Sequence, residues 1–330
     1  MMEAVRLGAT GPTVSVVGLG CMSMSEGHGA SDDRESLATI RAAVEGGITL
    51  FDTGDYYGCG HNELLLREAL GSRRRDVTLS VKFGALRDPA GRWTGLDCRP
   101  TAVKNAVTYS LKRLGTEYID IYQPGRLDPA VPIEDTVGAV ADLIQDGYVR
   151  YLGLSEMSLD IVERAHAVHP VTALEVEYSF LARGIEPRTL PRLRELGIGV
   201  VAYGVFTHGL LSGRVRARED VLGPGDFRAF LPQFSAENIT GNLQLAREFA
   251  LFAGEQGLSP AQLASAWVRS RGADVVPVLG ARNRISLADI LDGANAVLDP
   301  AATAELERRV RFDRVRGDRY PPDQMEMVHR

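Results

Sequence analysis

Lysine and cysteine are both scarce in this chain. Each shortage limits the kinds of functional site that the sequence can contain. Only three of the 37 basic residues are lysines, so arginine carries most of the positive charge. The three cysteines, Cys21, Cys59 and Cys98, show neither the CxxC spacing of a zinc site nor the pattern of a disulfide framework. We therefore expect a cytoplasmic protein with reduced thiols and no bound metal.

The sequence also lacks long apolar runs and concentrated basic charge. It has no stretch of about 18 uncharged apolar residues, and MMEAVRLGAT at the N-terminus has no apolar signal core. The net charge of −6 is spread along the chain, and the one tight basic cluster, Arg73 to Arg75, is typical of a solvated turn. We expect neither a membrane nor a nucleic acid as a partner, and the oligomeric state stays open.

Short β-rich runs alternate with helical patterns through all 330 residues, without a break in composition. After a short N-terminal β-hairpin, the runs with strand character are 14–19, 48–52, 77–82, 119–123, 149–154, 173–176, 199–202 and 275–279. Helical spacing is found over 32–45, 63–70, 99–114, 133–145, 159–168, 238–256 and 260–271. Eight strand-like runs that alternate with helical segments predict an α/β fold, a (β/α)8 TIM barrel formed as a single domain over residues 1–330.

An aspartate, a tyrosine and a lysine stand out in two short segments, FDTGDYYG (51–58) and LSVKFG (79–84). Asp52 and Lys82 end two successive predicted strands, and Tyr57 follows on the loop after the first. Because the active site of such a barrel forms at the carboxyl ends of its strands, we expect the three to converge. An ammonium favours the ionised form of a neighbouring phenol, so this set can exchange a proton with a carbonyl group.

Several other polar features favour ordinary structural roles. Tyr56 is expected to pack. The Gly18-Leu19-Gly20 sequence fails as a dinucleotide fingerprint because Ser23 stands where the last glycine belongs. Three histidines lie in separate loops without metal-ligand spacing, namely His28, His61 and His208. We expect them on the surface or lining a pocket.

The segments FDTGDYYG, NELLLREAL, VKFG, YIDIYQ, GLSE, EYS, AYG and VPVLGARNR follow one another in an order and spacing that resembles the aldo-keto reductases. The resemblance runs through almost the whole chain. It implies a (β/α)8 barrel that binds NADP(H) and reduces a small aldehyde or ketone. It also implies that Tyr57 is the general acid, that Lys82 lowers its pKa, and that Asp52 pairs with Lys82.

The resemblance further assigns contacts at the nicotinamide. Ser155 and Glu156 replace a Ser-Asn pair that holds the nicotinamide amide, and Glu175 stands where glutamine is usual. A carboxylate only accepts hydrogen bonds when ionised, so one of these acids would have to be protonated or turned away. Tyr203 would stack on the nicotinamide ring.

The rest of the cofactor is assigned in the same way. Residues 204–213 would wrap the pyrophosphate with backbone N–H groups, and Arg282, assisted by Arg284, would bind the 2′-phosphate as a planar fork. Asp289 would preserve part of an adenine contact. The cofactor contacts implied in total are Met22, Ser155, Glu156, Glu175, Tyr203, Gly204, Gly209, Leu211, Gly213, Gly280, Arg282, Arg284 and Asp289.

Two long irregular segments, 206–233 and 312–330, resemble the variable loops that shape specificity at the carboxyl-terminal face of these barrels. Tyr320 is a candidate pocket contact, with disorder of the tail as the alternative. Trp93, in the long segment after the strand that carries Lys82, could close over a substrate.

One position departs from the family. In YIDIYQPGRLDP, Gly125 stands where a histidine usually hydrogen-bonds the substrate carbonyl. Tyr57 would then orient the carbonyl alone, or a water would help, or the substrate differs. This leaves an NADPH-binding redox sensor or interaction subunit, like the related potassium-channel β-subunits, as an alternative. A lyase with Lys82 as a Schiff-base nucleophile is disfavoured because Asp52 would keep the amine charged.

Overall fold

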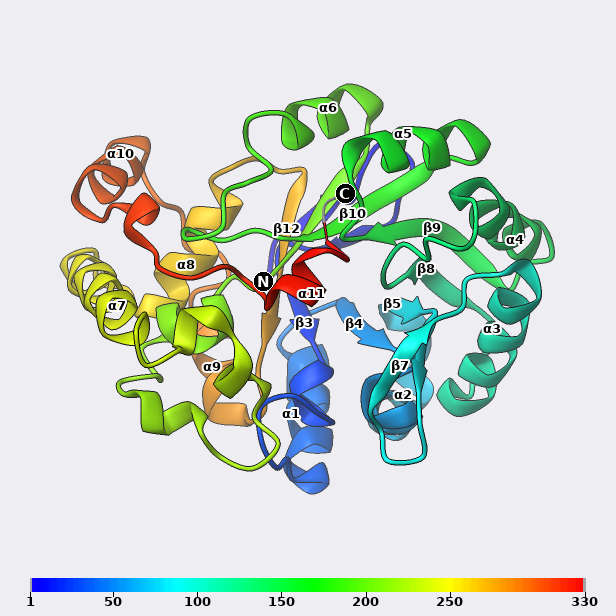
Figure 1. Cartoon of the computed structure of the whole chain (residues 1–330), viewed down its shortest axis with the longest axis horizontal. Coiled ribbons are helices and arrows are strands. Elements are labelled where there is room, and N and C mark those ends of the chain that lie inside the picture. The colour runs from blue at the N-terminus through cyan, green and yellow to red at the C-terminus, as the bar shows by residue number, and fades with distance from the viewer. Residues whose placement is uncertain (1, 329–330) are drawn as a thin grey trace.

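A closed barrel of eight parallel strands forms the centre of the molecule in the computed structural model, which describes residues 2–328 (Figure 1). In order around the barrel the strands are β3 (Gly18–Gly20), β4 (Leu50–Gly54), β5 (Thr78–Phe83), β8 (Ile119–Pro124), β9 (Val149–Ser155), β10 (Val171–Glu177), β11 (Gly199–Tyr203) and β12 (Val275–Gly280). Strand β12 pairs with β3 and closes the ring. The predicted (β/α)8 barrel is confirmed.

Helices surround the barrel, as Figure 1 shows. They are α1 (Asp33–Glu45), α2 (His61–Leu70), α3 (Pro100–Leu114), α4 (Ile133–Gln145), α5 (Leu159–Val168), α6 (Thr189–Leu196), α7 (Ile239–Glu255), α8 (Pro260–Arg269), α9 (Arg284–Asp292) and α10 (Pro300–Arg309). The short helix α11 (Pro322–Met325) lies over one end of the barrel instead. The apolar spacing does not predict α6, because this short helix buries only Leu190 and Leu193 and contains a proline.

The N-terminal hairpin closes one end of the barrel. It pairs β1 (Ala4–Arg6) with β2 (Thr13–Ser15) in antiparallel fashion, and the predicted run 14–19 is divided between β2 and β3. Leu7 and Val14 of this hairpin region pack with the apolar side chains that fill the barrel, among them Leu50 and Val276. The barrel is therefore filled and capped at its amino-terminal end.

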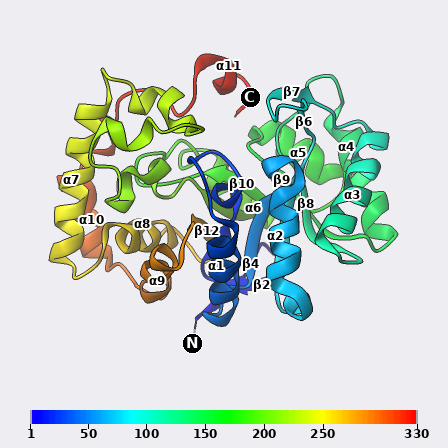
Figure 2. The same cartoon turned by 90° about the horizontal axis from the view of Figure 1, so that it is seen from below.

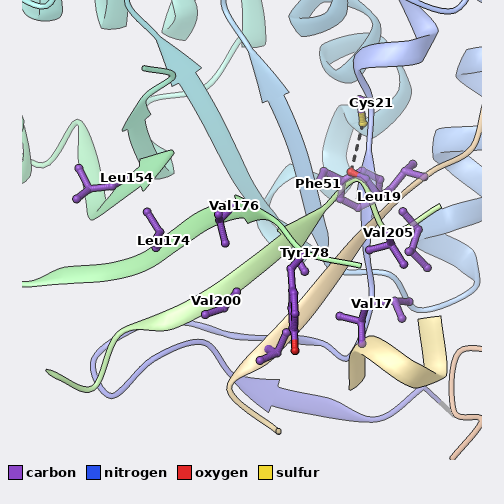
Figure 3. Packing of buried hydrophobic residues seen from close by; sticks show 14 of the residues in the cluster. Val17, Leu19, Cys21, Phe51, Leu154, Leu174, Val176, Tyr178, Val200 and Val205 are labelled. Carbon is purple, nitrogen blue, oxygen red and sulfur yellow. Dashed lines mark hydrogen bonds between the residues drawn. The ribbon is translucent and has the colours of Figure 1, made fainter. Parts of the chain in front are cut away.

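A second apolar layer lies between the strands and the helices. Figure 3 shows part of it, with Leu19, Phe51, Leu174 and Val200 among the buried side chains. The Cys21 thiol, drawn at the edge of this cluster, donates to the Leu19 carbonyl oxygen at 3.7 Å. Helices cover one face of the barrel strands, and the side chains inside the barrel cover the other. Because both faces are buried, the strand sequences are nearly continuous apolar runs.

The long loops gather at the opposite end of the barrel. Figure 2 shows the hairpin of β6 (Ala85–Arg87) and β7 (Trp93–Leu96), the segment after β11, and α11 at the end away from the N-terminus. Tyr320 and Val328 of the tail pack with buried side chains of the segment after β11. Within residues 2–328, no helix has the length and apolarity that crossing a membrane requires.

Candidate active site

A cavity of about 1070 Å³ opens at the carboxyl ends of the barrel strands. Asp52 on β4, Lys82 on β5 and Tyr57 just after β4 all line it. Trp93 of the β6–β7 hairpin also lines it and is 40% exposed. The three residues singled out from the sequence therefore meet at one open end of the barrel.

Strand alternation explains why a lysine reaches this cavity from a buried strand. Successive side chains of a strand point to opposite faces. In β5, Leu79, Val81 and Phe83 belong to the outer apolar layer. Ser80 and Lys82 face the other way, and Lys82 lies near the end of the strand where the barrel opens.

Two carboxylates hold the Lys82 ammonium. Its Nζ lies 2.5 Å from Oδ2 of Asp52 and 2.8 Å from Oε1 of Glu175. Burial alone would lower the pKa of Lys82, but the two carboxylates more than offset it, and the pKa is raised well above its ordinary value. Glu175, which the sequence suggests as a nicotinamide contact, thus lines the cavity and is also an ion-pair partner of Lys82.

Neighbouring groups fix the second oxygen of Glu175. Gln123 on β8 donates from Nε2 to Oε2 of Glu175 at 2.6 Å and to the Ser80 hydroxyl at 2.9 Å. All three side chains are buried. Sequence reasoning did not identify Gln123, although the YIDIYQ motif that contains it was recognised as a strand.

The buried cluster around Lys82 has one more acid than base. Burial, followed by the charge of Glu175, raises the pKa of Asp52 well above its ordinary value, and Lys82 opposes both effects. Asp52 Oδ1 is buried and has no hydrogen-bond partner in the described residues. The arrangement favours retention of a proton by the cluster, which relieves the excess negative charge.

Tyr57 lies against this cluster. It begins the 3₁₀ turn Tyr57–Gly60, in which Gly58 and Cys59 have positive φ angles of 56° and 54°. Its ring centroid is 5.6 Å from Lys82 Nζ. Lys82 lowers the pKa of Tyr57 in the expected direction, but burial has the larger effect, so the net pKa is raised. The phenol therefore stays protonated and suits a proton donor.

Ser155 and Tyr203 occupy the wall beside Glu175. Both line the cavity, and Ser155 is fully buried. The Ser155 hydroxyl has no hydrogen-bond partner among residues 2–328. A buried hydroxyl at a cavity wall fits a polar ligand group such as a carboxamide.

The tail is tied to this wall by an arginine. Arg319 lies between two fully buried carboxylates, with Nη1 at 3.0 Å from Glu177 Oε2 and Nη2 at 3.3 Å from Glu156 Oε2. Tyr203 donates to Glu156 at 2.8 Å, and its hydroxyl lies 3.0 Å from that of Tyr320. Glu156 thus holds the tail and does not line the cavity, while Tyr320 does.

The far end of the cavity is rich in arginine. Arg214, Arg228 and Arg282 all line it. Arg228 is paired with Asp226 at 2.6 Å, whereas Arg282 donates to the His28 carbonyl oxygen at 2.5 Å and has no carboxylate within 4.0 Å in the described part of the chain. Partial burial, then repulsion from Arg228, lowers the pKa of Arg282. An anion would relieve that repulsion.

Comparison with known proteins decides the family. The model of the aldo/keto reductase family matches residues 16–310. The chain belongs to this family. Members typically use NADP(H).

Solved structures agree with this assignment. The glycerol dehydrogenase of Gluconobacter oxydans is 27% identical, with a TM-score of 0.84 and coverage of 94% of this chain and 96% of its own. A Bacillus halodurans aldo-keto reductase is 26% identical, with a TM-score of 0.77 and coverage of 94% and 97%. A Klebsiella pneumoniae aldo-keto reductase, solved with NADP and acetate, shares the fold at 24% identity, with a TM-score of 0.73 and coverage of 97% and 99%.

Most cofactor contacts implied for an aldo-keto reductase line the cavity, and a few do not. Those that line it are Met22, Ser155, Glu175, Tyr203, Gly204, Gly209, Gly280, Arg282 and Asp289. Leu211 is buried in the outer apolar layer, and Gly213 ends the 3₁₀ turn Thr207–Ser212 with a φ of 72°. Arg284 is exposed and binds Glu35 at 3.0 Å on the surface. Glu156 is paired with Arg319 and does not line the cavity either.

Some residues that line the cavity of this aldo-keto reductase were not identified from the sequence. Arg214 donates to the Ser286 hydroxyl, and both line the cavity. Arg214 directly follows the segment expected to wrap a pyrophosphate, and that position was the available clue. His28 and His208 line the cavity and both make edge contacts with the Phe227 ring, in agreement with the pocket-lining role considered for them.

Proposed function

We propose that this aldo-keto reductase uses NADPH to reduce a small aldehyde or ketone to an alcohol, with Tyr57 as the proton donor. The observation that carries the proposal is the meeting of Tyr57, Lys82 and Asp52 at one cavity. All of these groups come from one barrel, so we propose that the chain acts as a single catalytic domain. We also propose the cytoplasm as its location, where the three free cysteines would stay reduced.

The cavity residues fit NADPH at both ends. The unpartnered hydroxyl of buried Ser155 suits the carboxamide, and Tyr203 suits the flat ring. At the other end, Arg282 and Arg214 supply cations without carboxylate partners among the described residues, which suits phosphate groups. The bound cofactor would supply a hydride to the substrate.

The chain's own residues would handle the proton. As a hydride reaches the carbonyl carbon, the carbonyl electron pair moves to the oxygen, and Tyr57 protonates that oxygen. Lys82 stabilises the phenolate that Tyr57 becomes, because its ammonium lies close to the ring. Asp52 and Glu175 keep Lys82 charged and fixed in place.

The experiment that tests this function mixes the purified protein and NADPH with a panel of aromatic and aliphatic aldehydes and ketones. Loss of NADPH absorbance with formation of an equal amount of alcohol supports the reductase. Tight NADPH binding without turnover on any compound supports the alternative of a redox sensor or interaction subunit. That alternative is favoured by one observation, the glycine at position 125 in place of an imidazole.

The lyase alternative is weakened further by the contacts of Lys82. A Schiff base requires a neutral amine, but two buried carboxylates raise the pKa of this lysine well above its ordinary value. Borohydride treatment in the presence of carbonyl compounds should therefore trap no adduct on Lys82.

We expect Arg282→Ala to weaken NADPH binding about 10- to 100-fold, the usual magnitude for hydrogen bonds to a charged group. NADH lacks the 2′-phosphate, so its affinity should change much less. Arg284→Ala is the matched control, because Arg284 lies outside the cavity and binds Glu35 at the surface. Titration of cofactor fluorescence measures both affinities, and equal losses for the two cofactors would contradict the role of Arg282.

We expect Glu175→Gln to change how reduction depends on pH. The charge of Glu175 raises the pKa of Tyr57, so its removal should lower that pKa. Reduction needs protonated Tyr57, and its decline at alkaline pH should therefore move to lower pH in the variant.

The matched control for this pH experiment is Glu177→Gln on the same strand. Glu177 is also buried, but it is paired with Arg319 and does not line the cavity that Tyr57 lines. In Glu177→Gln, the decline of reduction at alkaline pH should occur at the same pH as in the wild type. A shift to higher pH in Glu175→Gln would contradict the assignment of Tyr57 as the titrating acid.

A further inference from the structure

The space beside Gly125 is filled by a tyrosine hydroxyl. A Cβ atom added to Gly125 would lie 2.6 Å from Tyr56 Oη and 3.3 Å from the ring atoms Cε1 and Cζ. No real Cβ tolerates the first distance, so the hydroxyl already takes up the volume where a side chain at position 125 would begin. The glycine at this position is thus a condition for the placement of Tyr56.

Neighbouring groups hold the Tyr56 ring in this place. A Cβ on Gly54 would lie 3.4 Å from its Cε1 and Cζ, an ordinary van der Waals contact, so the ring lies directly beside Gly54. The Arg87 guanidinium carbon lies 5.8 Å from the ring centroid, and Arg87 is itself bound to Glu26 at 2.9 Å. The ring therefore lies against Gly54 and Gly125 and near a cation that is itself held by a carboxylate.

Tyr56 and Tyr57 border the same cavity. Their ring centroids are 5.0 Å apart and the rings are nearly perpendicular, at 84°. Both residues line the cavity together with Lys82, Gly125 and Arg126. Two tyrosines from consecutive positions of the chain therefore line one pocket.

The state of the Tyr56 hydroxyl suits a hydrogen-bond donor. Burial raises the pKa of Tyr56 to about 12, although Lys82 and Arg126 lower it. The group is thus protonated at neutral pH. No residue in the described part of the chain takes its proton in a hydrogen bond within 3.5 Å, so the O–H can turn toward a ligand.

From this geometry we propose that the Tyr56 hydroxyl is a second hydrogen-bond donor to the substrate carbonyl oxygen, in the place that a histidine at position 125 would serve. The inference rests on the proposed reductase function. Tyr57 gives up its proton to the oxygen, while Tyr56 keeps its own and stabilises the negative charge as it develops. Tyr56 is then a catalytic residue that contacts the substrate.

Substitution of Tyr56 by phenylalanine tests this role because the ring beside Gly54 and Gly125 is kept. We expect Tyr56→Phe to reduce kcat for an aldehyde about 10²-fold, the usual effect of removing one oxyanion donor. NADPH affinity and the melting temperature should match the wild type.

A second variant tests the position of the same Tyr56 hydroxyl oxygen. Gly125→Ala keeps both hydroxyls but forces Tyr56 Oη away, so kcat should fall in this variant too. Tyr56→Phe removes the hydroxyl oxygen that would lie 2.6 Å from a Cβ at position 125. Gly125→Ala should therefore cause a much smaller further loss of kcat when it is added to Tyr56→Phe. Such a double-mutant cycle with strong coupling supports the proposal.

The outcomes separate this inference from the function on which it rests. Wild-type kcat in both Tyr56→Phe and Gly125→Ala, with Tyr57→Phe inactive, would overturn the role of Tyr56 and leave the reductase standing. Additive losses in the cycle would also overturn it. Full activity of Tyr57→Phe would remove the proposed function and the inference together.

Discussion

Tyr57→Phe is expected to lower the rate of carbonyl reduction by about 10²- to 10⁴-fold while NADPH binding is retained. The variant loses the only atom that would deliver a proton to the developing alkoxide. Its ring stays beside Lys82, at 5.6 Å in the wild type, so the buried cluster and the shape of the cavity are kept. Single-turnover oxidation of bound NADPH by an excess of aldehyde measures the rate.

Tyr122→Phe provides the control for this experiment. Tyr122 is fully buried on β8, stacks on Phe83 at 4.2 Å, and does not line the cavity. Its hydroxyl has no hydrogen-bond partner among residues 2–328, so its loss should leave both stability and rate close to the wild type. If Tyr57→Phe behaved like Tyr122→Phe, another group would have to be the acid.

Lys82→Met should reduce both activity and stability. The methionine fills a similar volume but leaves the buried carboxylates of Asp52 and Glu175 without their cation. Removing one partner of a buried ion pair lowers the free energy of unfolding by about 3–5 kcal/mol. Reduction should slow by at least about 10²-fold, because nothing then stabilises a phenolate at Tyr57. Urea unfolding and the aldehyde assay measure the two effects.

The pH dependence and a second substitution check the cause of that instability. Protonated carboxyls can be buried without a counter-charge, so the deficit relative to the wild type should shrink as the pH falls toward about 4. Adding Glu175→Gln to Lys82→Met should recover part of the stability but none of the activity. A double variant that regained activity would show that Lys82 acts only as a structural group.

Much of the barrel could be predicted because burial leaves a direct trace in sequence. Strand β5 is apolar on its outer face at Leu79, Val81 and Phe83, and that alternation is visible without coordinates. Helix α6 escaped prediction because two buried leucines give too little periodicity. The run over 14–19 looked like one strand, since both the hairpin and the barrel bury their residues there.

The site could be predicted only in part. Asp52, Tyr57 and Lys82 could be predicted because the strand ends of a barrel converge regardless of the loop conformations. The pairing of Lys82 with Glu175 could not be foreseen, because it depends on which way two side chains turn across the barrel mouth. The approach of Tyr56 to Gly125 depends in the same way on a loop conformation.

The contacts of the C-terminal tail were even harder to predict from the sequence. Nothing in the sequence near Arg319 indicates that its partners are Glu156 and Glu177, which lie more than a hundred residues earlier. The sequence suggested Glu156 as a nicotinamide contact by position alone. A buried carboxylate needs a partner, and in this chain an arginine from the tail supplies it.

The most direct test of the central claim follows the hydride itself. NADPH deuterated at the nicotinamide carbon that donates it is incubated with the protein and a reducible aldehyde, and the alcohol is analysed by mass spectrometry. The account predicts one deuterium on the carbinol carbon for each NADPH oxidised. Oxidation of NADPH without deuterium in an alcohol, or no oxidation with any carbonyl compound despite tight binding, would contradict it.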